Sequence, residues 1–232
     1  MRVPNQPQSI LDLKGTESGR LFFIGSGPSL LTQMDLLPRL SSERTWAINK
    51  YPGWMERPLT PNFYSISEPA QCDRHGRQRF AFPHIGDEMT KFAIHWSAAD
   101  TLGFNWVSKA PVDQTIFHGY PYQGMGDNLA PLAQCYNGFL TAMQLAMWMG
   151  FTEFYFVGNE MTLSGYPWEH VDDPVPRIIT QHQQARIFQA YEFVRDAVPF
   201  RMVDCTPEGN LNTRGILEYT DLRIVLNDQE SL

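Results

Sequence analysis

The sequence predicts an α/β protein with a mostly parallel sheet, flanked by helices and interrupted by a central irregular insertion. Two observations lead to this prediction. Short apolar segments end in glycine or small polar residues, as LFFI does at the start of LFFIGSGPSLL (21–31). Long amphipathic segments alternate with such strands in the second half of the chain, and this alternation favours parallel strands joined by right-handed crossovers.

The first half of the chain begins with three strands and one short helix. LFFI (21–24) is a buried-strand pattern closed by glycines, and TWAIN (45–49) and NFYSI (62–66) are the next two strands. Pro28 suits the first position of a helix, where its missing N–H is not needed and its φ is already helical. A short helix is therefore expected after the glycines, ending before Pro38.

Periodicity fades over residues 67–133, where proline and glycine are frequent. Two short strands are expected within this segment, around FAIHW (92–96) and QTIFH (114–118). A long, weakly patterned segment in a compact domain is usually functional, so this one is interpreted as an acceptor-binding insertion or lid. The chain as a whole divides into an N-terminal arm (1–19) and a single domain (20–232) that carries the insertion.

Regular patterns return in the last hundred residues. Residues 135–150 have apolar side chains at helical spacing, and Gly150 stands where a helix C-terminus is expected. FTEFYFVG (151–158) is then a buried strand, and FRMVDCTP (200–207) is expected to be the terminal strand. Between them lies a long amphipathic helix, residues 181–198, with Ile187, Tyr191, Val194 and Val198 on one stripe.

Composition limits the function classes. The 232 residues are 43% hydrophobic and 19% charged, as in ordinary globular proteins. The net charge of −7 argues against a protein that coats a nucleic-acid backbone. Three widely spaced cysteines imply no disulfide framework, which favours a reducing, cytoplasmic setting. No apolar run approaches the roughly 20 residues of a membrane span, so none is expected.

The turn Gly25-Ser26-Gly27-Pro28-Ser29 is the first candidate site. A strand that ends in glycines before a helix presents backbone N–H groups and a helix dipole, both suited to a phosphate. The dinucleotide fingerprint needs a third glycine for close helix–strand packing, and Leu30 stands there, so NAD is disfavoured. A P-loop is excluded because no Gly-Lys-Ser/Thr follows. The alternative is a tight turn without a ligand.

Three blocks of the sequence together resemble a group of Rossmann-like transferases. The blocks are I-G-S-G-P-S-L followed by Asn49, then NGFLTAMQLAMWMGFTEFYFVGNEM (137–161), then ARIFQAYEFV with VDCTPEGNL. They cover about half of the chain and do not extend to 67–133. One member group is the bacterial sialyltransferases that begin with a G-N-G-P-S-L turn, and another includes the archaeal 6-hydroxymethylpterin diphosphokinases. The resemblance implies a Rossmann-like fold and a nucleotide-activated donor.

The resemblance also implies donor-binding positions. Gly25, Ser26, Gly27, Pro28 and Ser29 correspond to the G-N-G-P-S turn, with a hydroxyl at Ser26 where the family has an amide. The remaining positions that match are Asn49, Ser65 in place of a further Asn, the pair Asn137 and Gly138, and Gly158 with Glu160 in place of the G-X-D motif.

Two histidines are candidates for a general base. The family's base precedes its last long helix, and the matching position is His182; His170 in GYPWEH is the rival. A histidine titrates near neutrality and can therefore accept a proton from an acceptor hydroxyl. Tyr166 and Trp168 beside His170 are candidates to stack on a base or sugar. The alternative roles are a solvent-facing histidine and aromatic side chains at the edge of the core.

Charged clusters supply the remaining candidates. Arg74, Arg77 and Arg79 are candidate anion contacts for an acceptor, with a solvated loop as the alternative. Residues 169–173 contain three carboxylates that are candidates to hold Mg²⁺ with substrate phosphates, and a charged surface loop is the preferred alternative.

The leading interpretation is a transferase with a nucleotide-activated donor, in its main form a metal-independent glycosyltransferase similar to the sialyltransferases. It expects a nucleotide sugar as donor and no permanently bound cofactor. The first alternative is a Mg²⁺-dependent diphosphokinase that transfers diphosphate from ATP to a small, pterin-like alcohol. The second is a non-catalytic Rossmann-like binding or assembly module. The sequence leaves open the acceptor (a glycan, a small alcohol or a modified nucleic acid) and whether the protein is a homo-oligomer.

Overall fold

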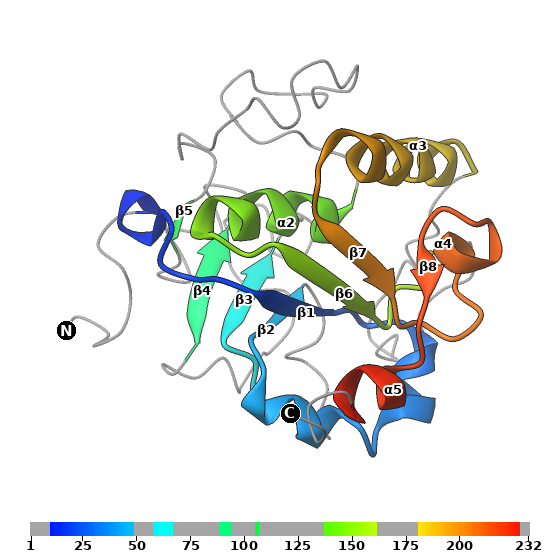
Figure 1. Ribbon diagram of the computed structural model, residues 1–232, viewed down its shortest axis with the longest axis horizontal. Coiled ribbons are helices and arrows are strands. Elements are labelled where there is room, and N and C mark those ends of the chain that lie inside the picture. Colours follow the sequence, from blue (N-terminus) through cyan, green and yellow to red (C-terminus); the bar gives the residue numbers. More distant parts are fainter. Residues whose placement is uncertain are drawn as a thin grey trace, which may run out of the picture.

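The computed structural model describes residues 10–48, 58–66, 89–93, 105–106, 137–161 and 181–227. Within this part of the chain, eight strands form one sheet in the order β5-β4-β3-β2-β1-β6-β7-β8 (Figure 1). Every pair of neighbouring strands is parallel. The predicted α/β class, with a parallel sheet flanked by helices, is confirmed.

The first three strands and the strand that ends at residue 157 lie where the sequence predicts them. The strand β4 begins two residues before the predicted segment 92–96, whereas the predicted strand 114–118 lies outside the described residues. The prediction that 200–207 is the terminal strand is wrong, because the two-residue β8 follows β7 and is too short to leave a pattern. The strands are β1 (Arg20–Ile24), β2 (Thr45–Ile48), β3 (Phe63–Ile66), β4 (Thr90–Ala93), β5 (Asn105–Trp106), β6 (Glu153–Val157), β7 (Arg201–Asp204) and β8 (Glu218–Tyr219).

The helix predicted after the glycine turn takes a different form. Two six-residue 3₁₀ helices follow the turn, and each has a proline in its first two positions, Pro28 in the first and Pro38 in the second. Proline suits these positions in either helix type, so it predicts the start of a helix but not its hydrogen-bond pattern. The helices are η1 (Ile10–Leu13), η2 (Pro28–Gln33), η3 (Leu37–Ser42), α2 (Gly138–Met149), α3 (Gln181–Ala197), α4 (Asn210–Thr213) and α5 (Leu222–Asn227).

The helix α2 is defined at both ends by its sequence. The side-chain carbonyl of Asn137 accepts hydrogen bonds from the N–H groups of Phe139 and Leu140, which is N-cap geometry. At the other end Gly150 has φ 113°, a conformation that favours glycine, and its N–H donates to the carbonyl of Ala146. The predicted helix end at Gly150 is therefore confirmed.

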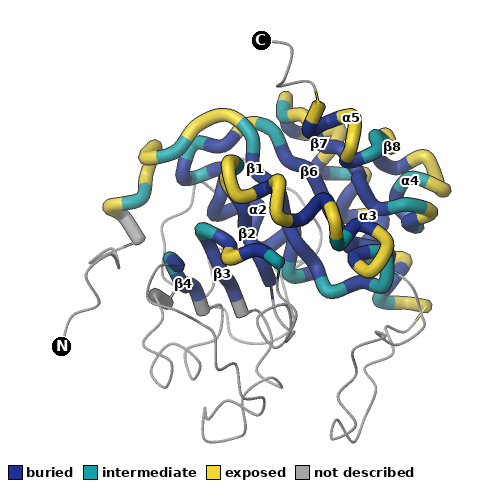
Figure 2. The backbone as a smooth tube through the Cα atoms, turned by 90° about the horizontal axis from the view of Figure 1, so that it is seen from below, coloured by how far each residue is buried: buried dark blue, intermediate teal, exposed yellow. Residues whose placement is uncertain are grey.

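Helices cover both faces of the sheet (Figure 1). The longer helices α2 and α3 pack on one face, where the predicted stripe of α3 is buried as expected. The 3₁₀ helices η2 and η3 and the helix α5 pack on the other face. Successive side chains of a strand point to opposite faces, so Leu21 and Phe23 of β1 belong to one cluster, and Phe22 and Ile24 to the other. Both sets are buried because both faces are covered. All of β1 is buried apart from its first residue (Figure 2).

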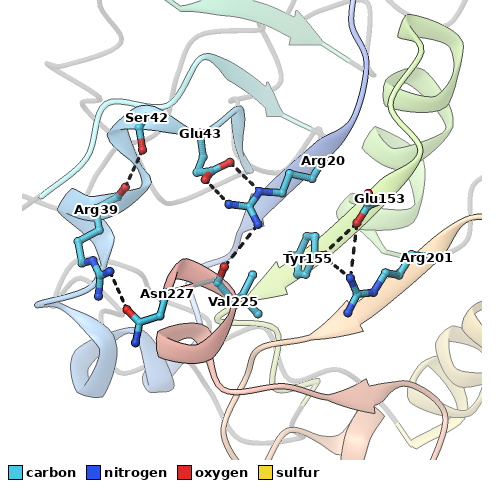
Figure 3. A network of polar contacts seen from close by, with 9 residues as sticks. All are labelled: Arg20, Arg39, Ser42, Glu43, Glu153, Tyr155, Arg201, Val225 and Asn227. Atoms are coloured by element: carbon cyan, nitrogen blue, oxygen red, sulfur yellow. Dashed lines mark hydrogen bonds and ion pairs between the residues drawn. The ribbon is translucent and has the colours of Figure 1, made fainter. Parts of the chain in front are cut away.

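Charged residues at the amino-terminal ends of the strands make contacts within the sheet and with the segments that cover one of its faces (Figure 3). Arg20, the first residue of β1, donates to both carboxylate oxygens of Glu43 and to the carbonyl of Val225 in α5. Arg201 donates to the Tyr155 hydroxyl at 3.1 Å, and burial raises the pKa of this phenol. Structural contacts thus engage the side chains at the amino-terminal ends of these strands.

Candidate functional site

The order of the strands changes direction between β1 and β6. From β1 the chain proceeds to β2 on one side, and later returns to β6 on the other side of β1. In open parallel sheets, ligands bind beyond the carboxyl ends of the strands at such a switch point. Here the register pairs Ile24 with Val157, so that Gly25 and Gly158 follow at the same level. The glycine turn and the predicted Gly158–Glu160 segment are therefore brought together.

The three glycines at this point are required by close contacts within the chain. A Cβ on Gly25 would lie 2.2 Å from the carbonyl oxygen of Gly158, and one on Gly27 would lie 1.3 Å from Oε2 of Glu160. Gly158 itself has φ 68°, and a Cβ there would meet the Cγ of Leu30 at 2.7 Å. Leu30 is fully buried and so fills the space against Gly158. In dinucleotide-binding turns a third glycine lets the helix pack closely against the strand. Here Leu30 stands at that position, and its side chain packs against Gly158 instead.

The carboxylate of Glu160 lies in the glycine turn. Its Oε1 accepts a hydrogen bond from the Ser29 N–H at 2.5 Å, and the residue is only 8% exposed. Its Oε2 is buried without a hydrogen-bond partner, as is the hydroxyl of Ser29, among the residues that the structure describes. The two ends of this contact are separated by 131 positions in the sequence.

The N–H groups expected to hold a phosphate are engaged within the protein. Gly25 donates to the carbonyl of Val157 at 2.9 Å, and Gly27 to that of Gly158 at 3.1 Å. The N–H of Leu30 donates to the carbonyl of Gly27 at 3.2 Å, as 3₁₀ geometry requires. The six-residue η2 also has a smaller dipole than a long α-helix. The turn therefore offers a phosphate less than its sequence predicts.

The backbone after Glu160 is held in an unusual conformation. Met161 has φ 51°, which a residue with a side chain rarely adopts. The side-chain amide of Asn210 donates to the carbonyls of Glu160 and Met161, each at 3.0 Å, and Gln184 in α3 donates to the Met161 carbonyl. Such conformations persist where the surroundings enforce them and are frequent at functional sites. The loop that positions Glu160 is thus fixed by Asn210, which lies between β7 and β8, and by Gln184 in the first turn of α3.

A polar network connects this loop with α3, with the end of β7 and with the N-terminus of α2. The Asn159 amide donates to the Tyr191 hydroxyl at 3.1 Å, and its N–H donates to the hydroxyl of Thr206 at 2.9 Å. Asn137 belongs to the same network, because its amide donates to the sulfur of Met161 at 3.3 Å. Asn137 is thereby committed to helix capping and loop support, and Gly138 is the first residue of α2.

Asp204 is a buried acid at the end of β7. Burial raises its pKa to about 6, although hydrogen bonds from Thr206 and Asn212 oppose the shift. The charge of Glu160 raises it further. Oδ1 accepts from the Thr206 N–H at 3.0 Å, and Oδ2 accepts from the Asn212 amide at 2.9 Å. The adjacent Cys205 thiol is fully buried, and burial raises its pKa as well.

The other predicted site residues that the structure describes lie in the turn, in the core and on the surface of α3. Ser26 is half-buried in the turn, and the Ser65 hydroxyl accepts from the Trp46 indole at 2.9 Å inside the core. His182 is exposed on the first turn of α3, two residues before Gln184, which contacts the Glu160 loop. The predicted residues outside the described part of the chain are Asn49, Arg74, Arg77, Arg79, Tyr166, Trp168, His170 and the acidic segment 169–173.

Sequence reasoning missed Asp204, Asn210 and Tyr191 as parts of this site. The signal for the first two was D-C-T-P-E-G-N (204–210), which begins at the last residue of β7 and is rich in turn and polar residues. Tyr191 lies on the buried stripe of α3 and gave no separate signal.

Searches against models of protein families, curated proteins and solved structures find no match to this chain. Within the described residues, no helix is long and apolar enough to cross a membrane. The same residues contain no group of three or more His, Cys, Asp or Glu side chains placed to hold a metal ion.

Proposed function

We propose that the protein is a transferase that uses a nucleotide-activated donor, and specifically a glycosyltransferase similar to the bacterial sialyltransferases. One observation carries the proposal. Glu160, beside the glycine turn, and the first turn of α3, which bears His182, are joined through the Gln184–Met161 hydrogen bond at the switch point of the sheet. A positioned acidic residue that orients the donor and an exposed histidine that acts as general base are groups that such a transfer can use.

In this proposal the turn 25–29 and Asn49 hold the donor, and Glu160 orients it. His182 or His170 removes the proton of an acceptor hydroxyl, whose oxygen attacks the anomeric carbon of the donor sugar. A new C–O bond forms as the bond from that carbon to the phosphate oxygen breaks, and the nucleotide leaves with the bonding electrons. The segment that bears the three arginines (residues 74–79) and the aromatic pair at 166 and 168 would contact the acceptor. We further propose that the protein acts in the cytoplasm.

A screen of thermal stability tests this function directly. The melting temperature is measured with nucleoside mono- and diphosphates, nucleotide sugars and ATP. A ligand that binds the folded state raises it by mass action, so a nucleotide sugar or its nucleotide product should do so. If no nucleotide changes the melting temperature, the transferase proposal fails. Dependence of turnover on Mg²⁺, shown by its loss in EDTA, would instead support diphosphate transfer from ATP to a small alcohol.

A specific observation also favours a second candidate, a Rossmann-like module that binds a partner without turnover. Three N–H groups of the glycine turn, and that of Leu30 next to it, are bonded within the protein, and a carboxylate of the chain itself lies where an anion would bind. These backbone donors are satisfied without a ligand. This candidate predicts no response to any nucleotide in the same screen, so one measurement separates the two.

A further inference from the structure

The glycine turn already contains an anion, and it is part of the chain. The Glu160 carboxylate accepts the Ser29 N–H and lies directly over Gly27, where a Cβ would be 1.3 Å from Oε2. A phosphate brought to the same place would meet a carboxylate instead of free N–H groups, and like charges at short distance repel. The phosphates of a nucleotide are therefore excluded from the turn while Glu160 remains there.

The atoms left without partners define what the turn can accept. Oε2 of Glu160 accepts hydrogen bonds only, and the Ser29 hydroxyl can accept or donate. Both are buried and have no partner among the described residues. A buried carboxylate oxygen without a partner is costly, and a donor from a ligand would remove that cost. The complementary group carries a hydrogen-bond donor for Oε2 and a second polar group for the Ser29 hydroxyl, as the paired hydroxyls of a ribose do.

The surroundings hold Glu160 in position. Its backbone carbonyl accepts both the N–H and the side-chain amide of Asn210, at 3.1 and 3.0 Å, and Met161 next to it is fixed at a positive φ. An acceptor atom supported in this way is positioned before any ligand arrives, which favours selective binding. Asp204, whose pKa the charge of Glu160 raises, is also acidic and adds no positive charge that would attract a phosphate.

We propose that Glu160 makes the glycine turn a binding position for the ribose of a nucleotide and directs its phosphates elsewhere. This inference rests on the proposed function, because it specifies how the nucleotide donor is oriented. It departs from the phosphate role that the turn's sequence suggests.

Matched nucleotides test the inference. The dissociation constants of the mono- and diphosphates of adenosine, guanosine, cytidine and uridine are measured by calorimetry, each beside its 2′,3′-dideoxy counterpart. The nucleotide that binds the wild-type protein should lose affinity at least about tenfold without its ribose hydroxyls, as expected for a hydrogen bond to a charged group. The variant Glu160→Gln has nearly the same shape but places an amide donor at the Oε2 position. It should lose the preference for ribose and bind the dideoxy nucleotide as the wild type does.

The control variant is Glu192→Gln, which makes the same change on the exposed face of α3 and should keep the ribose preference. Equal affinity for ribose and dideoxy forms in the wild type overturns the inference alone, as does a ribose preference that persists in Glu160→Gln. Should that variant not fold, the wild-type comparison still decides. Absence of binding by any of these nucleotides overturns the proposed function together with the inference.

Discussion

The carboxylate of Glu160 occupies the space that a side chain on Gly27 would need. A Cβ at Gly27 would lie 1.3 Å from Oε2 and 2.7 Å from the carbonyl oxygen of Gly158. Gly27 has an ordinary extended conformation, with φ −75° and ψ 159°, so its backbone alone does not demand glycine. The residue is glycine because another part of the chain is in contact with it.

Gly27→Ala should therefore destabilise the protein by about 1–3 kcal/mol, the usual range for overpacking. The added methyl group displaces the Glu160 carboxylate and also presses on a backbone oxygen. Chemical denaturation of Gly27→Ala, Glu160→Ala and the double variant measures the coupling. The double variant should be more stable than the sum of the single effects predicts. Strict additivity of the two single effects on stability would contradict the contact between Gly27 and Glu160.

Two adjacent leucines in η2 provide a matched pair for the core. Leu30 is fully buried against Gly158, whereas Leu31 is 52% exposed. Leu30→Ala should cost about 2–5 kcal/mol of the free energy of unfolding, because it leaves a cavity. Leu31→Ala should change it by about 0.5 kcal/mol or less. Similar losses of the free energy of unfolding in the two variants, measured by urea denaturation, would show that Leu30 is not packed against Gly158.

Glu208 has φ 54° and an exposed side chain, so its backbone strain is separable from its contacts. Glu208→Gly should stabilise the protein by roughly 0.5–1 kcal/mol, since glycine adopts this conformation without a Cβ penalty. The same substitution at the exposed Glu192, inside α3, should destabilise by about 1 kcal/mol. Differential scanning calorimetry compares the two melting temperatures. A lower value for Glu208→Gly would contradict the prediction.

Asp204 should make stability depend on pH in the acid range. Its pKa is about 6 in the folded protein, above the ordinary value of 3.8, so the folded state binds its proton more tightly. The stability from this group is complete below about pH 4 and is lost as the pH rises through about 6. Asp204→Asn removes the titration, so the variant should gain on the wild type by up to roughly 3 kcal/mol between about pH 4 and 7.

The test of this prediction is the difference in the free energy of unfolding between Asp204→Asn and the wild type, measured by denaturation at several pH values. Other carboxylates titrate in both proteins and cancel in that difference. A difference that stays constant over the whole range would contradict a raised pKa at Asp204.

His182→Ala should reduce turnover about 10²–10⁴-fold if His182 is the general base, with donor affinity and stability nearly unchanged. The side chain is exposed, so its removal leaves the core intact. Gln181→Ala on the same exposed turn is the control and should retain activity. The same measurement on His170→Ala decides between the two histidines. Full activity in both variants would exclude a histidine base at either position.

Local patterns predicted the central part of the fold. The strands that became β1 and β6 are continuous apolar runs because both faces of the sheet are buried, and such runs are visible in sequence. The helix end at Gly150 is a single-residue signal with a local cause and was predicted, whereas the N-cap at Asn137 was not. The two-residue strands β5 and β8 carry no period and could not be predicted.

The glycine turn shows the limit of sequence reasoning about the site. Its residues predicted a tight strand–helix turn, which is present, and donors for a phosphate, which are engaged. The carboxylate that changes its chemistry comes from a residue 131 positions away, and no local pattern records that contact. Similarly, Asn137 matched a donor-binding position but is held by capping and by Met161.

The pairing of β1 with β6 has a consequence for how the chain folds. These strands are neighbours in the middle of the sheet, yet Arg20 pairs with Glu153, roughly 130 residues later. Contacts between such distant segments form slowly, because a long loop must close before they stabilise anything. During synthesis β1 must wait, with one edge unpaired, until β6 has left the ribosome. The Glu160 contact that defines the candidate site can form only after that, so the site is assembled late and no earlier fragment of the chain contains it.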